Sequence, residues 1–228
     1  MDVKSILILV VGLANVILGF FILKKNPRSS INFWYFLLCF TGGGWAVVKA
    51  FQLSTPDLFW QYALIVKLTY ITGIFAPLSY LMLAYHFPYR IKDYSKKVIG
   101  FIFAVSIIMA CLVALGILVN HEIFNINGAL HREINFSHFL IFSVYFFVYV
   151  IWGFILLLKK FFKDTGIYKL QIKYLTLATA GTFFTTGVVS VILLLFNNFT
   201  YDWLGAIFLF IHFAIAGYLI FYKPNRKI

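Results

Sequence analysis

Seven long apolar runs, separated by short polar segments, constrain this chain more than any other feature of its sequence. Each run approaches or exceeds the roughly 20 residues that an α-helix needs to cross a bilayer. The alternating pattern of membrane barrels is absent. The sequence therefore predicts an all-α, polytopic membrane protein, a single bundle of seven transmembrane helices over residues 1–228. The predicted spans are 5–23, 31–51, 62–85, 98–119, 138–158, 174–196 and 204–222.

The composition agrees with a membrane setting. The chain is 63% hydrophobic and 11% charged, whereas soluble domains carry about 25% charged residues. A soluble chain of this kind would expose large apolar patches, so membrane lipids are the expected surroundings. The net charge of +12 would suggest nucleic acid in a soluble protein. Here the cations lie in short connections between apolar runs, so we expect no nucleic-acid partner.

The distribution of lysine and arginine predicts the orientation. All but four of the 19 Lys and Arg residues lie in alternate connections, on one side of the predicted bundle. Lys4 and Arg132 lie on the other side, and Lys49 and Lys67 lie inside runs. Because cytoplasmic loops are rich in Lys and Arg, we expect the N-terminus outside and the C-terminus in the cytoplasm of a multi-pass cell-membrane protein.

The stretch from Trp60 to Pro88 is the predicted central helix, and it carries one charge, Lys67. A lysine inside a span is costly and often marks a functional site. Lys67 and Lys49 both fall near the predicted outer rim, where they could bind a ligand or attract anions. The alternative is that each stem runs along the helix and brings its ammonium to the headgroups.

Pro77 and Gly73 predict a kink in the same helix. A proline removes one helical hydrogen bond and crowds the carbonyl four residues earlier, which is that of Gly73. The kink would be either a hinge or a static packing device.

Other polar and aromatic residues fall at depth in the predicted spans. Trp45 and Trp152 could line a pocket with Tyr70, whereas other tryptophans lie near span ends, as an interfacial belt does. His212 and Asn15 would hydrogen-bond within the bundle or line a wet cavity. A bonded structural role is the alternative for His212.

Small residues mark expected contacts between helices, because they let backbones approach closely in lipid. The sixth run places small residues every four positions, and the second run contains three consecutive glycines. We interpret both as packing seams, with a ligand contact at the glycines as the alternative. The residues are Ala178, Thr182, Thr186 and Ser190, and Gly42, Gly43 and Gly44.

The longest connection, Asn120 to Ser137, contains two histidines and two glutamates. Their spacing matches no known zinc pattern, so we expect a solvated loop, with no metal and no cofactor. Nucleophile–base sets and zinc-protease motifs are also missing. The chain is therefore not expected to be an enzyme.

Three stretches of the sequence resemble the seven-helix sensor region at the N-terminus of bacterial histidine kinases. The first is Trp60 to Pro88, with Lys67, Tyr70, Gly73 and Pro77 and the ending Tyr85-His86-Phe87-Pro88. The second is Lys169 to Leu175, a basic segment with a glutamine. The third is Ala214 to Tyr222, which contains Tyr218 and ends before a lysine.

This resemblance implies a signal-input module of a two-component system. An unknown small-molecule or lipid ligand would shift the helices, and the seventh would pass the change to a cytoplasmic output domain or a separate signalling partner. The resemblance also allows a homodimer. The sequence ends at Ile228 with no kinase domain, so we expect either part of a larger kinase or a free-standing module. The alternative function is a small transporter or channel.

Overall fold

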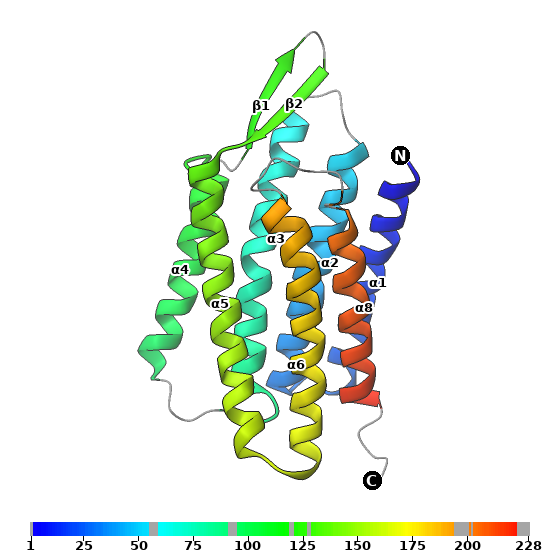
Figure 1. Ribbon diagram of the computed structural model, residues 1–228, viewed down its shortest axis with the longest axis vertical. Coiled ribbons are helices and arrows are strands. Elements are labelled where there is room, and N and C mark those ends of the chain that lie inside the picture. Colours follow the sequence, from blue (N-terminus) through cyan, green and yellow to red (C-terminus); the bar gives the residue numbers. More distant parts are fainter. Residues whose placement is uncertain are drawn as a thin grey trace.

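The computed structural model describes residues 2–54, 59–90, 95–118, 121–126, 129–193, 201 and 203–222. Within these ranges the chain forms seven long α-helices (Figure 1). They are α1 (Val3–Lys25), α2 (Ser30–Ser54), α3 (Phe59–His86), α4 (Lys96–Ala114), α5 (Phe136–Lys163), α6 (Gly166–Gly187) and α8 (Leu204–Gly217). Short π-helical segments extend α6 (η1, Val188–Ile192) and α8 (η2, Tyr218–Tyr222).

Six of these helices, α1 to α5 and α8 with its extension, are long and apolar enough to cross a membrane. The chain is therefore a multi-pass membrane protein. The remaining long helix, α6, is more polar because it contains two lysines, Gln171 and a row of threonines. Large hydrophobic side chains lie exposed around the bundle, as expected for a surface in contact with lipid.

The helix ends differ from the predicted ones where local capping decides them. α4 ends at Ala114 instead of Val119, because Gly116 adopts a left-handed backbone conformation with φ of 77°. α5 extends to Lys163, beyond the predicted Leu158, and it begins at a cap in which Asn135 accepts a hydrogen bond from the His138 amide. α6 begins at Gly166 rather than Tyr174.

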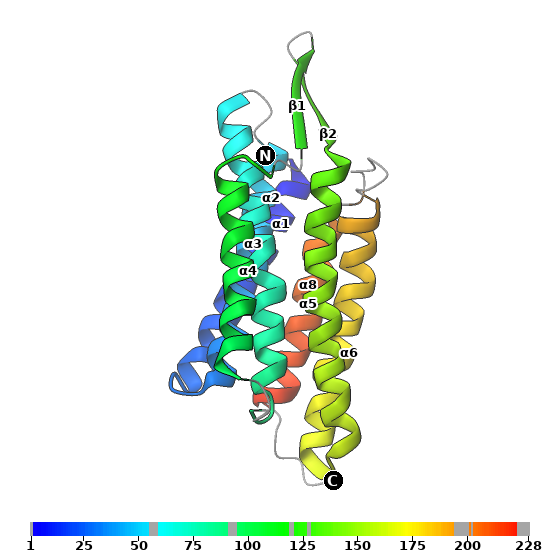
Figure 2. The same cartoon turned by 90° about the vertical axis from the view of Figure 1, so that its left-hand side faces the viewer.

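Six helices form a closed ring, and the seventh lies outside it. Each of α1, α2, α3, α5, α6 and α8 packs against the next in that order, and α8 returns to α1. α4 packs on the outside of the ring against α3 (Figures 1 and 2). The predicted central helix, α3, thus contacts α2, α4 and α5.

Glycines bring α1 and α2 into close contact. A Cβ atom added to Gly43 would lie 2.6 Å from the carbonyl oxygen of Gly12, so only a residue without a side chain fits there. The packing seam predicted at the three glycines is therefore present at Gly43. Gly44 differs, because a Cβ atom there would make an ordinary contact of 3.7 Å with Thr72.

The predicted loop between α4 and α5 contains an antiparallel hairpin, which the all-α expectation did not include. Its strands are β1 (His121–Ile126) and β2 (Ala129–Ile134), with Glu122 opposite Glu133. The hairpin projects beyond one end of the bundle (Figure 1). We refer to this end as the hairpin end.

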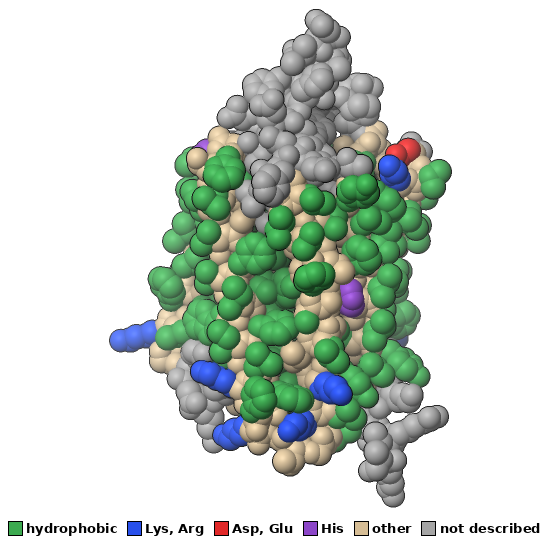
Figure 3. Space-filling view, in the orientation of Figure 1, with side chains coloured by type: hydrophobic (Ala, Val, Ile, Leu, Met, Phe, Trp, Pro, Cys, Tyr) green, Lys and Arg blue, Asp and Glu red, His purple; other side chains and the backbone are tan. Residues whose placement is uncertain are grey.

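The basic side chains gather at the opposite end of the bundle. Figure 3 shows Lys and Arg near this end and hydrophobic side chains over the middle of the visible face. We refer to it as the basic end. The start of α1 lies near the hairpin end and η2 lies near the basic end (Figure 1).

Candidate functional site

A cavity occupies the interior of the ring, between α2, α3, α5, α6 and α8. Its volume is about 90 Å³, and a single water needs only about 10–15 Å³ on this measure. The cavity therefore has room for several waters or for a small ligand. Most of its lining is apolar. It is lined by Leu38, Gly42, Trp45, Gly73, Ala76, Pro77, Tyr80, Phe142, Phe146, Thr179, Thr182, Phe183, Thr186, Gly187, Ser190, Leu209 and Phe213.

The wall from α6 and η1 carries most of the hydroxyl groups. Thr179, Thr182, Thr186 and Ser190 lie three or four residues apart and so share one face of the helix. The Thr182 hydroxyl donates to the carbonyl of Ala178 at 2.9 Å, and the Thr186 hydroxyl donates across to Gly205 on α8 at 3.1 Å. The seam predicted here is thus partly a helix contact and partly a cavity wall.

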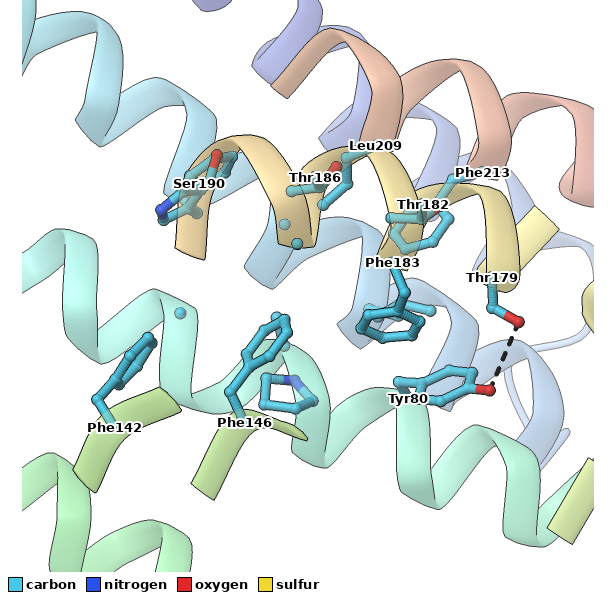
Figure 4. A pocket seen from close by; sticks show the side chains of 17 residues that line it. Tyr80, Phe142, Phe146, Thr179, Thr182, Phe183, Thr186, Ser190, Leu209 and Phe213 are labelled. Carbon is cyan, nitrogen blue, oxygen red and sulfur yellow. Dashed lines mark hydrogen bonds between the residues drawn. The ribbon is translucent and has the colours of Figure 1, made fainter. Parts of the chain in front are cut away.

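The opposite wall is aromatic. Figure 4 shows Phe142 and Phe146 of α5 across the cavity from the α6 hydroxyls. Toward the basic end, Tyr80 is 2% exposed and packs against Gly153, and its hydroxyl lies 3.5 Å from the Thr179 hydroxyl. Tyr80 therefore forms the floor of the cavity on that side.

Gly73 and Pro77 form part of the α3 wall, and α3 continues through both. The turn they belong to is braced from α5, because the Tyr145 hydroxyl donates to the carbonyl of Ile74 at 2.9 Å. Tyr145 also hydrogen-bonds Ser106 of α4 at 2.9 Å. The carbonyl that Pro77 leaves without its helical donor is that of Gly73, so the Tyr145 bond braces this turn without replacing the lost hydrogen bond.

Of the six residues predicted to bind a ligand, the structure places Trp45 in the cavity lining. Tyr70 lies one layer behind, edge-to-face against Phe142 with ring centroids 5.1 Å apart. His212 donates a hydrogen bond from Nδ1 to the Phe208 carbonyl, 2.7 Å away, and packs against Gly181. Trp152 is half-buried and packs against the main core.

The two lysines predicted near the rim lie outside the cavity lining. The ammonium of Lys67 donates to the carbonyl of Ala114 at 3.2 Å, at the last residue of α4. A cation is favourable there because helix C-termini carry partial negative charge. Lys49 is 5% exposed within the bundle.

A second polar cluster, not predicted from the sequence, lies at the basic end of α3. Lys160 of α5 is 3% exposed, although we counted it among the loop cations. Its three N–H groups are shared among the carbonyls of Ala84, Tyr85, Phe87 and Tyr89. Lys160 lies three and four residues after Leu157 and Leu156, which the structure buries on the same face of α5. Because residues 156–158 are all leucine, the sequence did not mark this face.

Tyr89 continues this cluster toward α6. Its hydroxyl donates to a carboxylate oxygen of Asp164 at 2.8 Å, and its ring packs edge-on against Tyr168. Desolvation of the hydroxyl, together with this hydrogen bond, raises the pKa of Tyr89 above its usual value. The end of α3 is therefore tied both to α5 and to the start of α6.

No group of side chains in the described ranges has the composition of a metal site. The histidines and glutamates of the predicted loop belong to β1 and β2. The cavity lining contains neither a carboxylate nor a histidine.

Comparison with protein families gives a match over nearly the whole chain. The family described as the N-terminal 7TM region of histidine kinase matches residues 7–224. No curated protein matches the chain. The family description explains the bundle of apolar helices. Residues 7–224 thus place the chain in the family of N-terminal seven-transmembrane regions of histidine kinases.

Proposed function

We propose that this chain is the signal-input module of a histidine kinase pathway in a bacterial cell membrane. In this proposal all seven helices span the bilayer, including α6, with the hairpin end outside and the basic end in the cytoplasm. Two observations support the orientation. Lys and Arg concentrate at the basic end, and the start of α1 and the end of η2 lie at opposite ends of the bundle.

The observation that carries the proposal is a cavity where five helices meet, in a chain of a sensor family. A ligand in this cavity would contact α3, α6 and α8 together. These helices can be separated or rotated relative to one another, which gives two arrangements of the bundle. A ligand that binds one arrangement more tightly shifts the equilibrium toward it, by the difference in binding free energy between the two. The partner that receives the signal is a kinase output domain, in the same chain or in another, and the working unit is a homodimer.

The cluster around Lys160 offers a route by which helix movement reaches the cytoplasmic side. It links the end of α3 to α5, and the ring contact of Tyr89 with Tyr168 links the same end to α6. Because an ammonium with four carbonyl partners is a stiff contact, a movement of α3 would be transmitted to both helices.

Of the residues that we expected to bind the ligand, Trp45 is proposed to contact it directly and Tyr70 to act through Phe142. The proposed hinge is Gly73 and Pro77, which lie in the cavity wall. For Lys67, Lys49, His212 and Trp152, contact with the ligand would require a rearrangement of the bundle.

The test joins the full chain, through its C-terminus, to the catalytic region of a soluble histidine kinase in liposomes. We expect a cavity-filling substitution, Ala76→Leu, to change autophosphorylation, while Phe101→Leu on the exposed face of α4 leaves it unchanged. Solute flux is measured in the same liposomes. Kinase activity indifferent to Ala76→Leu, or robust saturable transport, would overturn the sensor proposal and favour the transporter alternative.

A further inference from the structure

The α6 wall of the cavity extends from Thr179 to Ser190, which lie eleven positions apart, or about 16 Å along a helix. A volume of about 90 Å³ beside a wall of this length leaves room for a single chain of atoms. Such a shape suits an extended hydrocarbon chain better than a compact ring system.

The cavity lining is also uncharged. None of the side chains that line it is Lys, Arg, Asp, Glu or His. An ion placed inside would lose its hydration without gaining a counter-charge, which is strongly unfavourable. The lining therefore selects a neutral molecule.

The hydroxyl groups of α6 can still accept hydrogen bonds. The hydrogens of Thr179, Thr182 and Thr186 are each directed at a backbone carbonyl. A hydroxyl oxygen that donates in this way retains lone pairs. A ligand with a hydroxyl or an amide N–H could donate to them.

An unpartnered amide lies beside the same cavity. Asn15 of α1 is 0% exposed, and neither its amide nitrogen nor its amide oxygen has a hydrogen-bond partner among the described residues. Its nitrogen lies 3.6 Å from the point that a Cβ atom on Gly42 would occupy. Gly42 lines the cavity and has no side chain, and Leu209 Cδ2 lies 2.9 Å from the same point. The amide therefore lies behind the wall that Gly42 and Leu209 form. A buried amide without hydrogen-bond partners is unfavourable unless a bound molecule supplies them.

From these features we infer that the cavity binds a neutral, single-chain, lipid-like molecule with a hydroxyl or amide group, which hydrogen-bonds Asn15 and the α6 hydroxyls. The inference rests on the proposed function and specifies the ligand of that site. Such a molecule could be a component of the bilayer or a diffusible amphiphile. The two sources share the chemistry that the cavity recognises.

The test uses the full chain in nanodiscs and a photoreactive diazirine derivative of 1-dodecanol. We expect saturable labelling at cavity residues of α2 and α6, mapped by peptide mass spectrometry. Unlabelled 1-dodecanol should compete about tenfold better than dodecanoate or dodecylammonium, which have the same chain and a charge. Labelling confined to lipid-facing side chains, or equal competition by the charged probes, would overturn the inference.

Two variants separate binding from folding. Asn15→Leu removes an unsatisfied amide, so we expect a higher unfolding temperature together with dodecanol binding about tenfold weaker, the equivalent of one lost hydrogen bond. Thr182→Val should weaken binding by a similar factor. Thr185→Val is the matched control, because Thr185 also bonds its own helix but lies outside the cavity lining. Unchanged dodecanol affinity in both Asn15→Leu and Thr182→Val would contradict the inference.

The source of the ligand is distinguished by extracting the lipids that co-purify with the chain. A neutral single-chain lipid that is retained by the unmodified chain and lost in Ala76→Leu would identify a bilayer component. Its absence, with saturable dodecanol binding, would identify a diffusible ligand. The two proposals can fail separately. If dodecanol binds without changing kinase activity, the sensor proposal alone is contradicted. If kinase activity responds to Ala76→Leu but dodecanol does not bind, only the inferred ligand class is contradicted.

Discussion

The ammonium of Lys160 lies 2.8 Å from the carbonyl oxygen of Ala84, and this contact joins α5 to the end of α3. Three further carbonyls, those of Tyr85, Phe87 and Tyr89, accept from the same ammonium. The last carbonyls of a helix have no partner within it. Lys160 supplies that partner from another helix and places its positive charge at the negative end of the α3 dipole.

Replacement of Lys160 should destabilise the bundle. In Lys160→Met the side chain keeps its length but leaves several buried carbonyls without donors, at about 1–3 kcal/mol for each that water cannot reach. We expect a clear loss of unfolding free energy, measured by denaturant titration in micelles. The matched control is Lys159→Met, because Lys159 is the adjacent residue and is exposed. Equal stability of the two variants would show that the Lys160 contacts contribute little.

Much of the helical framework follows from the sequence, because long apolar runs in lipid leave few alternatives to helices. The run from Trp60 to Pro88 predicts α3 closely. The helix ends depend instead on local backbone conformation, and the left-handed Gly116 that ends α4 was not recognised. The hairpin was also not predicted, because the whole segment from Asn120 to Ser137 was interpreted as a loop.

Residue type alone brought only some of the cavity lining into view. Trp45 was predicted as a ligand contact and Gly73 and Pro77 as a hinge, and all three lie in the cavity lining; their roles stay predictions. A cavity, however, is a result of how several helices pack, and nothing local to Phe142 or Phe146 distinguishes them from the other phenylalanines. Lys160 was misread because the sequence Lys159-Lys160 does not reveal which lysine faces the interior.

Gly43 should tolerate no side chain. In Gly43→Ala the new Cβ atom would lie 2.6 Å from the Gly12 carbonyl oxygen, so the backbones of α1 and α2 would have to separate. Overpacking of this kind costs about 1–3 kcal/mol, and we expect a lower unfolding temperature. Gly44→Ala is the control, since its Cβ atom has an ordinary contact distance to Thr72. If the two alanine variants have the same unfolding temperature, the close approach of α1 and α2 is wrong.

The proposed orientation predicts which residues an impermeant reagent can reach. We would first replace the buried Cys39 and the exposed Cys111 by alanine, and then introduce Lys4→Cys or Lys97→Cys. Lys4 begins α1 at the hairpin end, and Lys97 lies in the first turn of α4 at the basic end. A maleimide that cannot cross the membrane should label the Lys4→Cys variant in intact cells. The Lys97→Cys variant should be labelled only after permeabilisation, and the reverse result would invert the topology.

Pro77 should matter for signalling more than for stability. Pro77→Ala gives α3 an amide that can donate to the Gly73 carbonyl, so the unfolding temperature should stay the same or rise. If Gly73 and Pro77 act as a hinge, the straighter helix responds less, and the change in kinase activity caused by 1-dodecanol should fall several-fold. Dodecanol affinity is measured alongside, because Pro77 also lines the cavity. Intact affinity with a reduced response identifies a hinge, whereas an undiminished response identifies a static kink that Tyr145 braces at the Ile74 carbonyl.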